Sequence, residues 1–207
     1  MIDVHTANTP NGIKIPIALE ELGVEYRIVR INLSANQQKS PDFLKINPNG
    51  RIPAIVDHDA ANGTSVSVFE SGAILLYVAD KYHALIPSDL KGRVRALEWL
   101  FFQVGAVGPM FGQAGWFKRS QEPMPAALER YQNESTRLVQ VLESRLAVVP
   151  WLAGDEFSIA DIANFGWLRR GGDYTGVDLS RFSAVNRWVS AIEMRPAVQR
   201  GLLAIQD

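Results

Sequence analysis

The sequence predicts an α/β N-terminal half followed by an all-α C-terminal half. Over residues 1–80, short runs rich in Ile and Val alternate with helical patterns. From residue 92 onward, only helical periodicity remains. The polar stretch "KYHALIPSDLKG", with Pro87 and Gly92, separates the two halves. We therefore expect an α/β domain over 1–80, a linker over 81–91 and a helical domain over 92–207.

The first elements are a short strand and an amphipathic helix. Ile2–His5 is an apolar run that predicts the strand, and the pattern over 13–22 predicts the helix. Pro16 is unfavourable inside a helix, because it lacks an N–H and its ring clashes with the preceding turn. The helix therefore either begins late, near Gly12 or Ile13, or is kinked.

The rest of this half predicts a βαβ unit continued by two strands and a helix. Alternation over 25–33 predicts a strand, and "SPDFLKINP" predicts a short helical turn. "RIPAIVDHD" and "SVSVFES" predict two strands, with Asn62-Gly63 as a hairpin signal between them. "SGAILLYVADKY" is apolar on most sides, which predicts a buried helix.

The C-terminal half predicts a series of helices. Apolar stripes extend over 94–117 and over 126–149. Ser158 and Asp161 in "SIADI" have the spacing of a capping box, which predicts the start of a further helix. Two shorter helices, 184–194 and 196–206, are expected to follow, divided at Pro196.

The composition is ordinary for a globular protein, with 207 residues of which 47% are hydrophobic and 21% charged. A net charge of −1 lacks the basic excess of a nucleic-acid binder. No apolar run reaches the roughly 18 residues of a membrane helix, and "MIDVHTANTP" lacks the pattern of a secretory signal. We therefore expect no nucleic-acid partner and no membrane association.

The sequence contains no cysteine, which excludes disulfides, thiolate metal ligands and a cysteine nucleophile. This absence fits a cytoplasmic location. His5, His58 and His83 are scattered without metal-ligand spacing, so we expect no metal site.

The stretch "NPNGRIPAIVD" places Ile52-Pro53 at the start of a strand. In one interpretation Pro53 only begins the strand, where a missing donor is tolerated. In the other, a cis bond presents the N–H and C=O of Ile52 outward, where an extended peptide can pair with them.

The stretch "FESGAILLY" places Glu70 and Ser71 before a buried helix. A helix N-terminus favours a carboxylate, and Glu70 can accept an ammonium, so the pair can hold an α-amino-acid head. The alternative is local: Ser71 caps the helix and Glu70 complements its dipole.

Arg130 and Arg137 are seven positions apart and so share one face of their helix. One interpretation is a solvated face on which Arg130 pairs with Glu134. The alternative is that an arginine of this face reaches a ligand carboxylate.

Taken together, these motifs resemble the cytosolic glutathione transferases over the whole chain. "TPNG", "NPNGRIPAIVD", "VFESGAILLY", "WLFFQVGAVGPMFGQ" and "ERYQNE" are most similar to the bacterial Nu class, the disulfide-bond reductase branch. The resemblance implies a thioredoxin-like N-terminal domain, a helical C-terminal domain, a cis bond at Pro53 and a homodimer. Trp99 and Phe102, which lie off the apolar stripe of 94–117, are candidates for the dimer contact.

The resemblance also implies glutathione as the bound substrate or co-substrate, and a role for each matching residue. These roles are Thr9 and Asn11 at the sulfur, Gln38 at the glycyl end, Ile52 and Pro53 along the cysteinyl unit, Glu70 and Ser71 at the γ-glutamyl head, and Arg130 at a second glutathione or at the ligand of a partner subunit.

The implied function is a glutathione-dependent disulfide-bond reductase in which two bound glutathione thiols replace protein cysteines. The alternatives are conjugation of glutathione to electrophiles and, third, a non-catalytic glutathione-binding module. Two departures from the family pattern bear on this. No Tyr or Cys lies near the first strand, and the Gly-rich stretch 169–178 differs from the aromatic stretch expected of close relatives.

Overall fold

The computed structural model describes residues 1–60 and 63–206, so Asn62 of the expected hairpin turn lies outside the described residues. The chain divides into an α/β unit, Met1–Leu85 with Met194–Asp207, and a helical unit, Ile86–Glu193. The predicted α/β half followed by an all-α half is confirmed. Within the described residues, no helix has the length and apolar character needed to cross a membrane.

The α/β unit is built on one four-stranded mixed sheet with the strand order β2-β1-β3-β4. The first two strands are parallel, and the other pairs are antiparallel. The strands are β1 (Ile2–Thr6), β2 (Tyr26–Arg30), β3 (Ala54–Asp57) and β4 (Val66–Phe69).

The register of these strands places several chain reversals at one end of the sheet. Thr6 pairs with Arg30, His5 pairs with Ala54, and Ala54 pairs in turn with Phe69. The ends of β1, β2 and β4 therefore lie beside the start of β3. We call this the site end of the sheet.

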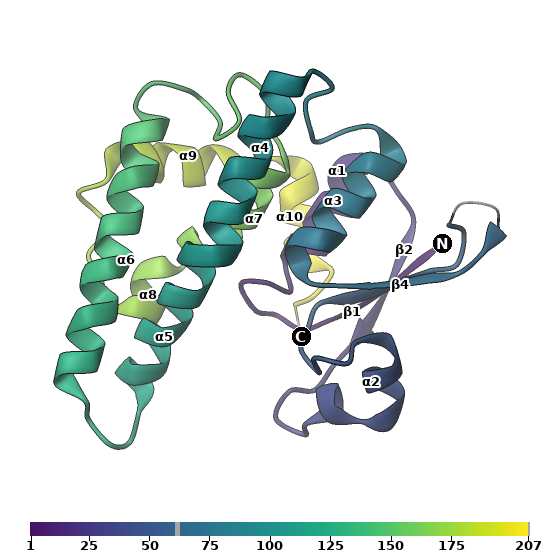
Figure 1. Cartoon of the computed structure of the whole chain (residues 1–207), viewed down its shortest axis with the longest axis horizontal. Coiled ribbons are helices and arrows are strands. Elements are labelled where there is room, and N and C mark those ends of the chain that lie inside the picture. Colours follow the sequence, from purple (N-terminus) through teal and green to yellow (C-terminus); the bar gives the residue numbers. More distant parts are fainter. Residues whose placement is uncertain (61–62, 207) are drawn as a thin grey trace. The chain divides into compact units, whose positions relative to one another are not determined.

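Helices cover both faces of the sheet (Figure 1). α1 (Lys14–Leu22) and α3 (Ser71–Tyr82) pack together on one face, and α2 (Pro41–Ile46) lies on the other. Alternation along β1 sends Val4 toward the paired helices and His5 toward α2, where its ring meets Phe43. The core of this unit lies between the sheet and the helix pair α1 and α3. Its fully buried side chains include Ile15, Leu19, Ile55, Ile74 and Leu75.

The last helix, α10 (Pro196–Leu203), packs against α1 within the α/β unit (Figure 1). Gly201 allows this close approach, because a Cβ there would lie 2.7 Å from the backbone nitrogen of Ile17. Arg195 forms a bidentate ion pair with Glu21, with both N···O distances 2.7 Å. The C-terminal segment is thus part of the first unit's core.

The helical unit begins with one long helical run, as the stripe over 94–117 predicts. It consists of α4 (Leu90–Phe102), a π-helical turn η3 (Gln103–Val107) and α5 (Gly108–Arg119). The π turn was not predicted. We attribute it to Pro109, which has no N–H to donate to the preceding turn. The proline ring would also clash with that turn if it were regular α-helix.

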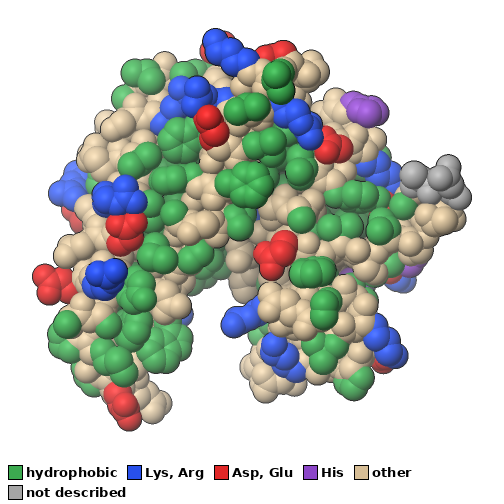
Figure 2. All heavy atoms as spheres, in the orientation of Figure 1, with side chains coloured by type: hydrophobic (Ala, Val, Ile, Leu, Met, Phe, Trp, Pro, Cys, Tyr) green, Lys and Arg blue, Asp and Glu red, His purple; other side chains and the backbone are tan. Residues whose placement is uncertain are grey.

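The surface of α4 differs from the predicted stripe. The stripe contains Leu100 or Phe101 and then Val104, but Leu100 is buried, Phe101 is 66% exposed and Val104, in the π turn, is 37% exposed. Trp99 and Phe102 are half-buried and contact each other edge to face, with ring centroids 5.4 Å apart. Figure 2 shows hydrophobic side chains gathered over this helix.

The remaining helices are α6 (Pro125–Leu146), α7 (Ile159–Leu168), α8 (Gly171–Thr175) and α9 (Ser183–Glu193). All but α8 match the predicted order, and α8 was not predicted. The capping box of Ser158 and Asp161 is confirmed at the start of α7. The Gly-rich stretch 169–178 forms α8, which packs against α5, and the Gln132 side chain donates to the Thr175 carbonyl at 2.8 Å.

Candidate functional site

The sheet register brings the predicted ligand-binding residues of the α/β unit to the site end. The loop with Thr9 and Asn11 follows β1, and Gln38 lies in the segment after β2. Ile52 and Pro53 precede β3, and Glu70-Ser71 follows β4. Residues far apart in the sequence therefore surround one end of one sheet. Arg130 belongs to the helical unit.

The loop after β1 is held in one shape by its own hydrogen bonds. The buried Thr6 hydroxyl donates to the Gly12 carbonyl at 2.9 Å, and the Thr9 N–H donates to the Ala7 carbonyl at 2.8 Å. The Gly12 N–H donates to Thr9 Oγ1 at 3.0 Å. This bond uses one of the two acceptor sites of the hydroxyl oxygen and leaves its hydrogen available, so Thr9 can act as a donor to a ligand.

The helix that follows starts late, which confirms one of the two alternatives raised by Pro16. α1 begins at Lys14, so Pro16 lies in the first turn, where no intrahelical donor is needed. Thr9 and Asn11 therefore lie in a turn outside the helix, and both side chains are half-buried.

The Ile52–Pro53 peptide bond is cis, as the resemblance implied. Ile52 is half-buried and lies two positions before Ala54, where the ladder to β1 and β4 begins. The side chain of Asn47 braces the preceding residue by donating to the Arg51 carbonyl at 2.6 Å. The backbone of Ile52 is therefore held just beyond the last ladder pair.

Gln38 lies in a single 3₁₀ turn, η1 (Gln37–Lys39). Its side-chain oxygen is buried and accepts no hydrogen bond from the residues that the structure describes. A buried acceptor without a donor is unfavourable, so this oxygen is suited to a donor that a ligand supplies.

Ser71 is not the cap of α3, which corrects the local interpretation of this motif. Ser71 is the first helical residue, and Glu70 occupies the cap position without a capping hydrogen bond from its side chain. Glu70 is exposed and has a φ of 70°, which is uncommon for a residue other than glycine. Its carboxylate accepts a weak hydrogen bond from Asn49 at 3.4 Å.

A buried lysine beneath Ser71 was missed by sequence reasoning. Lys14 is fully buried at the start of α1, and its Nζ donates to Ser71 Oγ at 3.2 Å. Burial lowers the pKa of Lys14 to about 7, and the charge of Glu70 opposes that shift. The sequence did contain a signal, because Lys14 lies within the apolar pattern "GIKIPIAL". Lysine is rarely buried in proteins, so a lysine among residues that face the core is unusual and marks a candidate site.

Arg130 is exposed on α6 and lines a groove of about 890 Å³ in the helical unit. The predicted pair of Arg130 with Glu134 is not formed. Glu134 instead pairs with Arg137, with N···O distances of 2.8 and 2.7 Å. The groove also contains Met110, Tyr131 and Asn133, so a cation lies beside apolar and amide groups.

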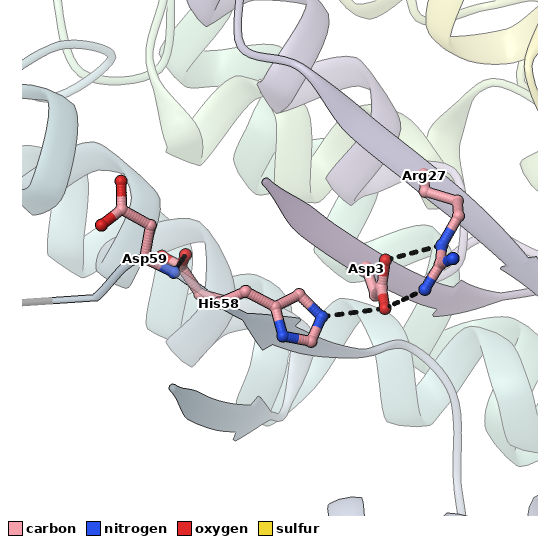
Figure 3. Close-up of polar contacts among 5 residues, drawn as sticks. Asp3, Arg27, His58 and Asp59 are labelled. Atoms are coloured by element: carbon pink, nitrogen blue, oxygen red, sulfur yellow. Dashed lines mark hydrogen bonds and ion pairs between the residues drawn. The ribbon is translucent and has the colours of Figure 1, made fainter. Parts of the chain in front are cut away.

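A second polar cluster lies near the opposite end of the sheet (Figure 3). Asp3 accepts two hydrogen bonds from Arg27, at 2.8 and 2.5 Å, and contacts His58 Nε2 at 3.0 Å. The hydrogen bond from Arg27 lowers the pKa of Asp3 to about 2. Within the described part of the chain, no group of acidic and histidine side chains has the arrangement of a metal site. We assign the cluster a structural role, joining β1 and β2 to the end of β3.

Two family models match the chain. The model of the glutathione S-transferase N-terminal domain matches residues 4–80, and that of the C-terminal domain matches residues 98–196.

Individual proteins are similar over nearly the full length. The disulfide-bond oxidoreductase YfcG of Escherichia coli is 45% identical, and the match covers 100% of this chain and 96% of that protein. A glutathione transferase from Burkholderia graminis, solved with two glutathione molecules per subunit, is 42% identical with a TM-score of 0.92, covering 97% of this chain and 87% of that one. A glutathione transferase from Pseudomonas putida, solved with one glutathione disulfide per subunit, is 39% identical with a TM-score of 0.92, covering 97% and 90%.

Proposed function

The chain belongs to the glutathione S-transferase family, and from this premise we propose that it is a glutathione-dependent disulfide-bond reductase. The substrates are two glutathione molecules and a small disulfide. The sequence has no cysteine, so both sulfurs that become oxidised come from glutathione.

The observation that carries this proposal is the hydrogen bond that fixes the Thr9 side chain. Thr9 Oγ1 accepts from the Gly12 N–H, and we propose that its own hydrogen is donated to the sulfur of a bound glutathione. A free thiol has a pKa of about 8.5, and a donor aimed at the sulfur favours the thiolate. Thr9, with Asn11 beside it, is therefore suited to keep a bound glutathione ionised near neutral pH.

Two exchange steps complete the reaction. The first glutathione thiolate attacks one sulfur of the disulfide, forms a mixed disulfide and releases one thiolate. The second glutathione thiolate then attacks the glutathionyl sulfur, which forms glutathione disulfide and releases the other thiolate. The two glutathiones lose two electrons in total, and their two protons go to the released thiols. The protein's task is to position the sulfurs in line.

The rest of the site fits an extended tripeptide. The backbone of Ile52, held beyond the ladder by the cis bond to Pro53, is proposed to pair with the cysteinyl unit. Glu70 and Ser71 are proposed to hold the γ-glutamyl head. The unpartnered oxygen of Gln38 is proposed to accept a hydrogen bond from the glycyl N–H.

Arg130 is proposed to bind a glutathione carboxylate, of a second glutathione or of the ligand of a partner subunit, in a homodimer. Its place in a groove, with no ion pair to Glu134, supports this role.

The test compares reduction of 2-hydroxyethyl disulfide with conjugation of 1-chloro-2,4-dinitrobenzene, each with glutathione. We expect disulfide reduction to dominate, and Thr9→Ala and Asn11→Ala to lower its kcat/KM about tenfold or more, because each removes a donor to the thiolate. The pH at which the rate reaches half its maximum should rise in Thr9→Ala and return in Thr9→Ser.

Thr136→Ala is the matched control, because that hydroxyl donates to the Gln132 carbonyl within its own helix. Unchanged reductase rates in both site variants, with glutathione still bound, contradict the assignment. Conjugation without disulfide reduction supports the transferase alternative, and tight glutathione binding without either reaction supports a binding module.

A further inference from the structure

A buried lysine amine lies directly beneath the start of α3. Lys14 Nζ donates to Ser71 Oγ at 3.2 Å, although both residues are buried. Keeping an ammonium out of water is costly unless nearby groups compensate. The site end thus contains a buried amine to which the reaction proposed above gives no role.

We propose that Lys14 is a positioning residue for the amino-acid head of the ligand. It holds Ser71 as a hydrogen-bond donor, and it supplies the positive charge that a ligand carboxylate meets at the start of α3. This inference rests on the proposed function, because it assumes that the γ-glutamyl head binds at Glu70-Ser71.

The hydrogen-bond geometry supports the first part of the role. When Lys14 is protonated it has only donors, so Ser71 Oγ then accepts from it. The protonated form, which a bound carboxylate favours, therefore leaves the Ser71 hydroxyl hydrogen available to that carboxylate. The arrangement repeats the one at Thr9, whose oxygen accepts from Gly12 and whose hydrogen is left to the ligand.

The electrostatics support the second part. Burial lowers the pKa of Lys14 to about 7, so the amine is largely neutral above that pH in the free protein. A carboxylate at Ser71 would favour the charged form, and Lys14 is already fully buried, so the ligand adds little further desolvation. Ligand binding should therefore raise the pKa of Lys14 and take up a proton.

The charge of Glu70, at the start of α3, acts on Lys14 and favours its protonated form. The acidic residues of α1 lie at its far end, where Glu20 pairs with Arg200 of α10 at 2.6 Å and Glu21 with Arg195. Lys81, at the far end of α3, pairs with Asp57 at 2.5 Å.

Calorimetric titration with S-methylglutathione tests the proposal, because this probe has the γ-glutamyl head and no thiol proton to release. Titrations at pH 7.5 in phosphate and in Tris buffers measure the protons exchanged on binding. We expect net uptake of a fraction of a proton by the parent protein, and an affinity that falls as pH rises above about 7.

Lys14→Met should bind S-methylglutathione about tenfold or more weakly and without proton uptake. It should also melt at the same or a higher temperature, because it removes a buried charge. A purely structural lysine would instead give a lower melting temperature. Lys14→Arg, charged at every pH used, should lack the uptake. Lys45→Met, on the exposed face of α2, is the matched control.

Parent-like affinity in Lys14→Met, or proton uptake that persists in it, overturns the role of Lys14. If both variants fail to fold, the titrations of the parent protein still test the proposal. An affinity of the parent for S-methylglutathione that does not change with pH, without proton uptake, also overturns the role of Lys14. A parent that does not bind S-methylglutathione contradicts the proposed function instead.

Discussion

Gly12 determines the shape of the loop that presents Thr9. A Cβ at this position would lie 1.9 Å from the Ala7 carbonyl oxygen and 2.7 Å from Thr6 Oγ1. Both atoms take part in the hydrogen bonds that close the loop. A side chain at position 12 must therefore open the loop, and Thr9 would lose the N–H that orients its hydroxyl.

Gly12→Ala is expected to lower kcat/KM for disulfide reduction more than it lowers stability. The steric conflict should destabilise the fold by about 1–3 kcal/mol, as overpacking commonly does. Enzyme kinetics and urea denaturation on the same preparation measure both effects. Gly105→Ala is the control, since nothing lies within 4 Å of a Cβ there. Equal kinetics in the two variants would show that the loop shape does not matter.

At this scale the sequence predicts some residues well and others poorly. Thr9 and Asn11 follow a strand and precede Pro16, and these local features predict a polar turn outside the helix, which the structure confirms, although both side chains are half-buried. The capping alternative for Ser71 is wrong, although capping is the simplest local interpretation of a serine before a helix, and the role of Ser71 at the γ-glutamyl head stays a prediction. Its actual partner, Lys14, is 57 positions away in the chain, and no local pattern indicates such a contact.

The start of α7 shows how an element is fixed by a buried carboxylate. Asp161 Oδ1 accepts from the Leu152 N–H at 2.9 Å and from Trp188 Nε1 at 2.8 Å. Its Oδ2 accepts from the N–H and the hydroxyl of Ser158, at 3.0 and 3.1 Å. One side chain thus joins the helix start to the preceding loop and to α9.

Asp161→Asn is expected to lower the free energy of unfolding by about 2 to 4 kcal/mol, because an amide NH₂ would face two donors. Burial raises the pKa of Asp161 from 3.8 to about 6, so the folded protein binds this proton more tightly than the unfolded chain. Its contribution to stability should therefore decrease as pH rises from about 4 to about 6, and the variant should lack that slope.

Urea denaturation across this pH range measures both effects. Asp178→Asn is the control, because that carboxylate is exposed and accepts from Ser180 in a local turn. If Asp161→Asn lowers the free energy of unfolding no more than Asp178→Asn does, the hydrogen bonds of Asp161 do not have the proposed stabilising role.

Elements with a local signal were predicted, and those without one were not. The capping box of α7 and the late start of α1 depend on residues a few positions apart. The π turn at Gln103–Val107 lies within an apolar stripe whose period resembles a regular helix. The stripe also left open whether Leu100 or Phe101 faces the core; Leu100 is buried and Phe101 is exposed.

At the scale of the molecule, α4 carries an apolar surface that suits a second copy of the chain. Its exposed side chains are spaced along one face of the helical run: Leu90, Val94, Phe101 and Val104. Exposed apolar groups aligned in this way are typical of contact surfaces. The partly buried Trp99 and Phe102 are less suited to the contact than the sequence suggested.

We expect sedimentation velocity to show a dimer at micromolar concentration and Phe101→Arg to shift it toward monomer, because a buried unpaired charge opposes association. Val148→Arg is the control, since Val148 is 76% exposed and lies in the loop after α6, outside the apolar face of α4. A parent protein that sediments only as a monomer contradicts the dimer and weakens the proposed role of Arg130. A dimer that Phe101→Arg leaves intact contradicts this choice of surface alone.

The order of elements along the chain was predictable because hydrophobic periodicity changes near residue 92. Which elements share a core was harder to foresee. The helical pattern of 196–206 gives no indication that α10 packs on α1, since that contact depends on Gly201 and Ile17 at opposite ends of the sequence.

The packing of α10 on α1 means that no single cut separates the chain into its two units. The first unit contains both chain ends, Met1–Leu85 and Met194–Asp207, so the helical unit is in effect an insertion between them. A fragment that stops at residue 85 loses the helix that covers α1 and the arginine partners of Glu20 and Glu21. During synthesis, the first unit can therefore complete its core only after the whole helical unit has left the ribosome.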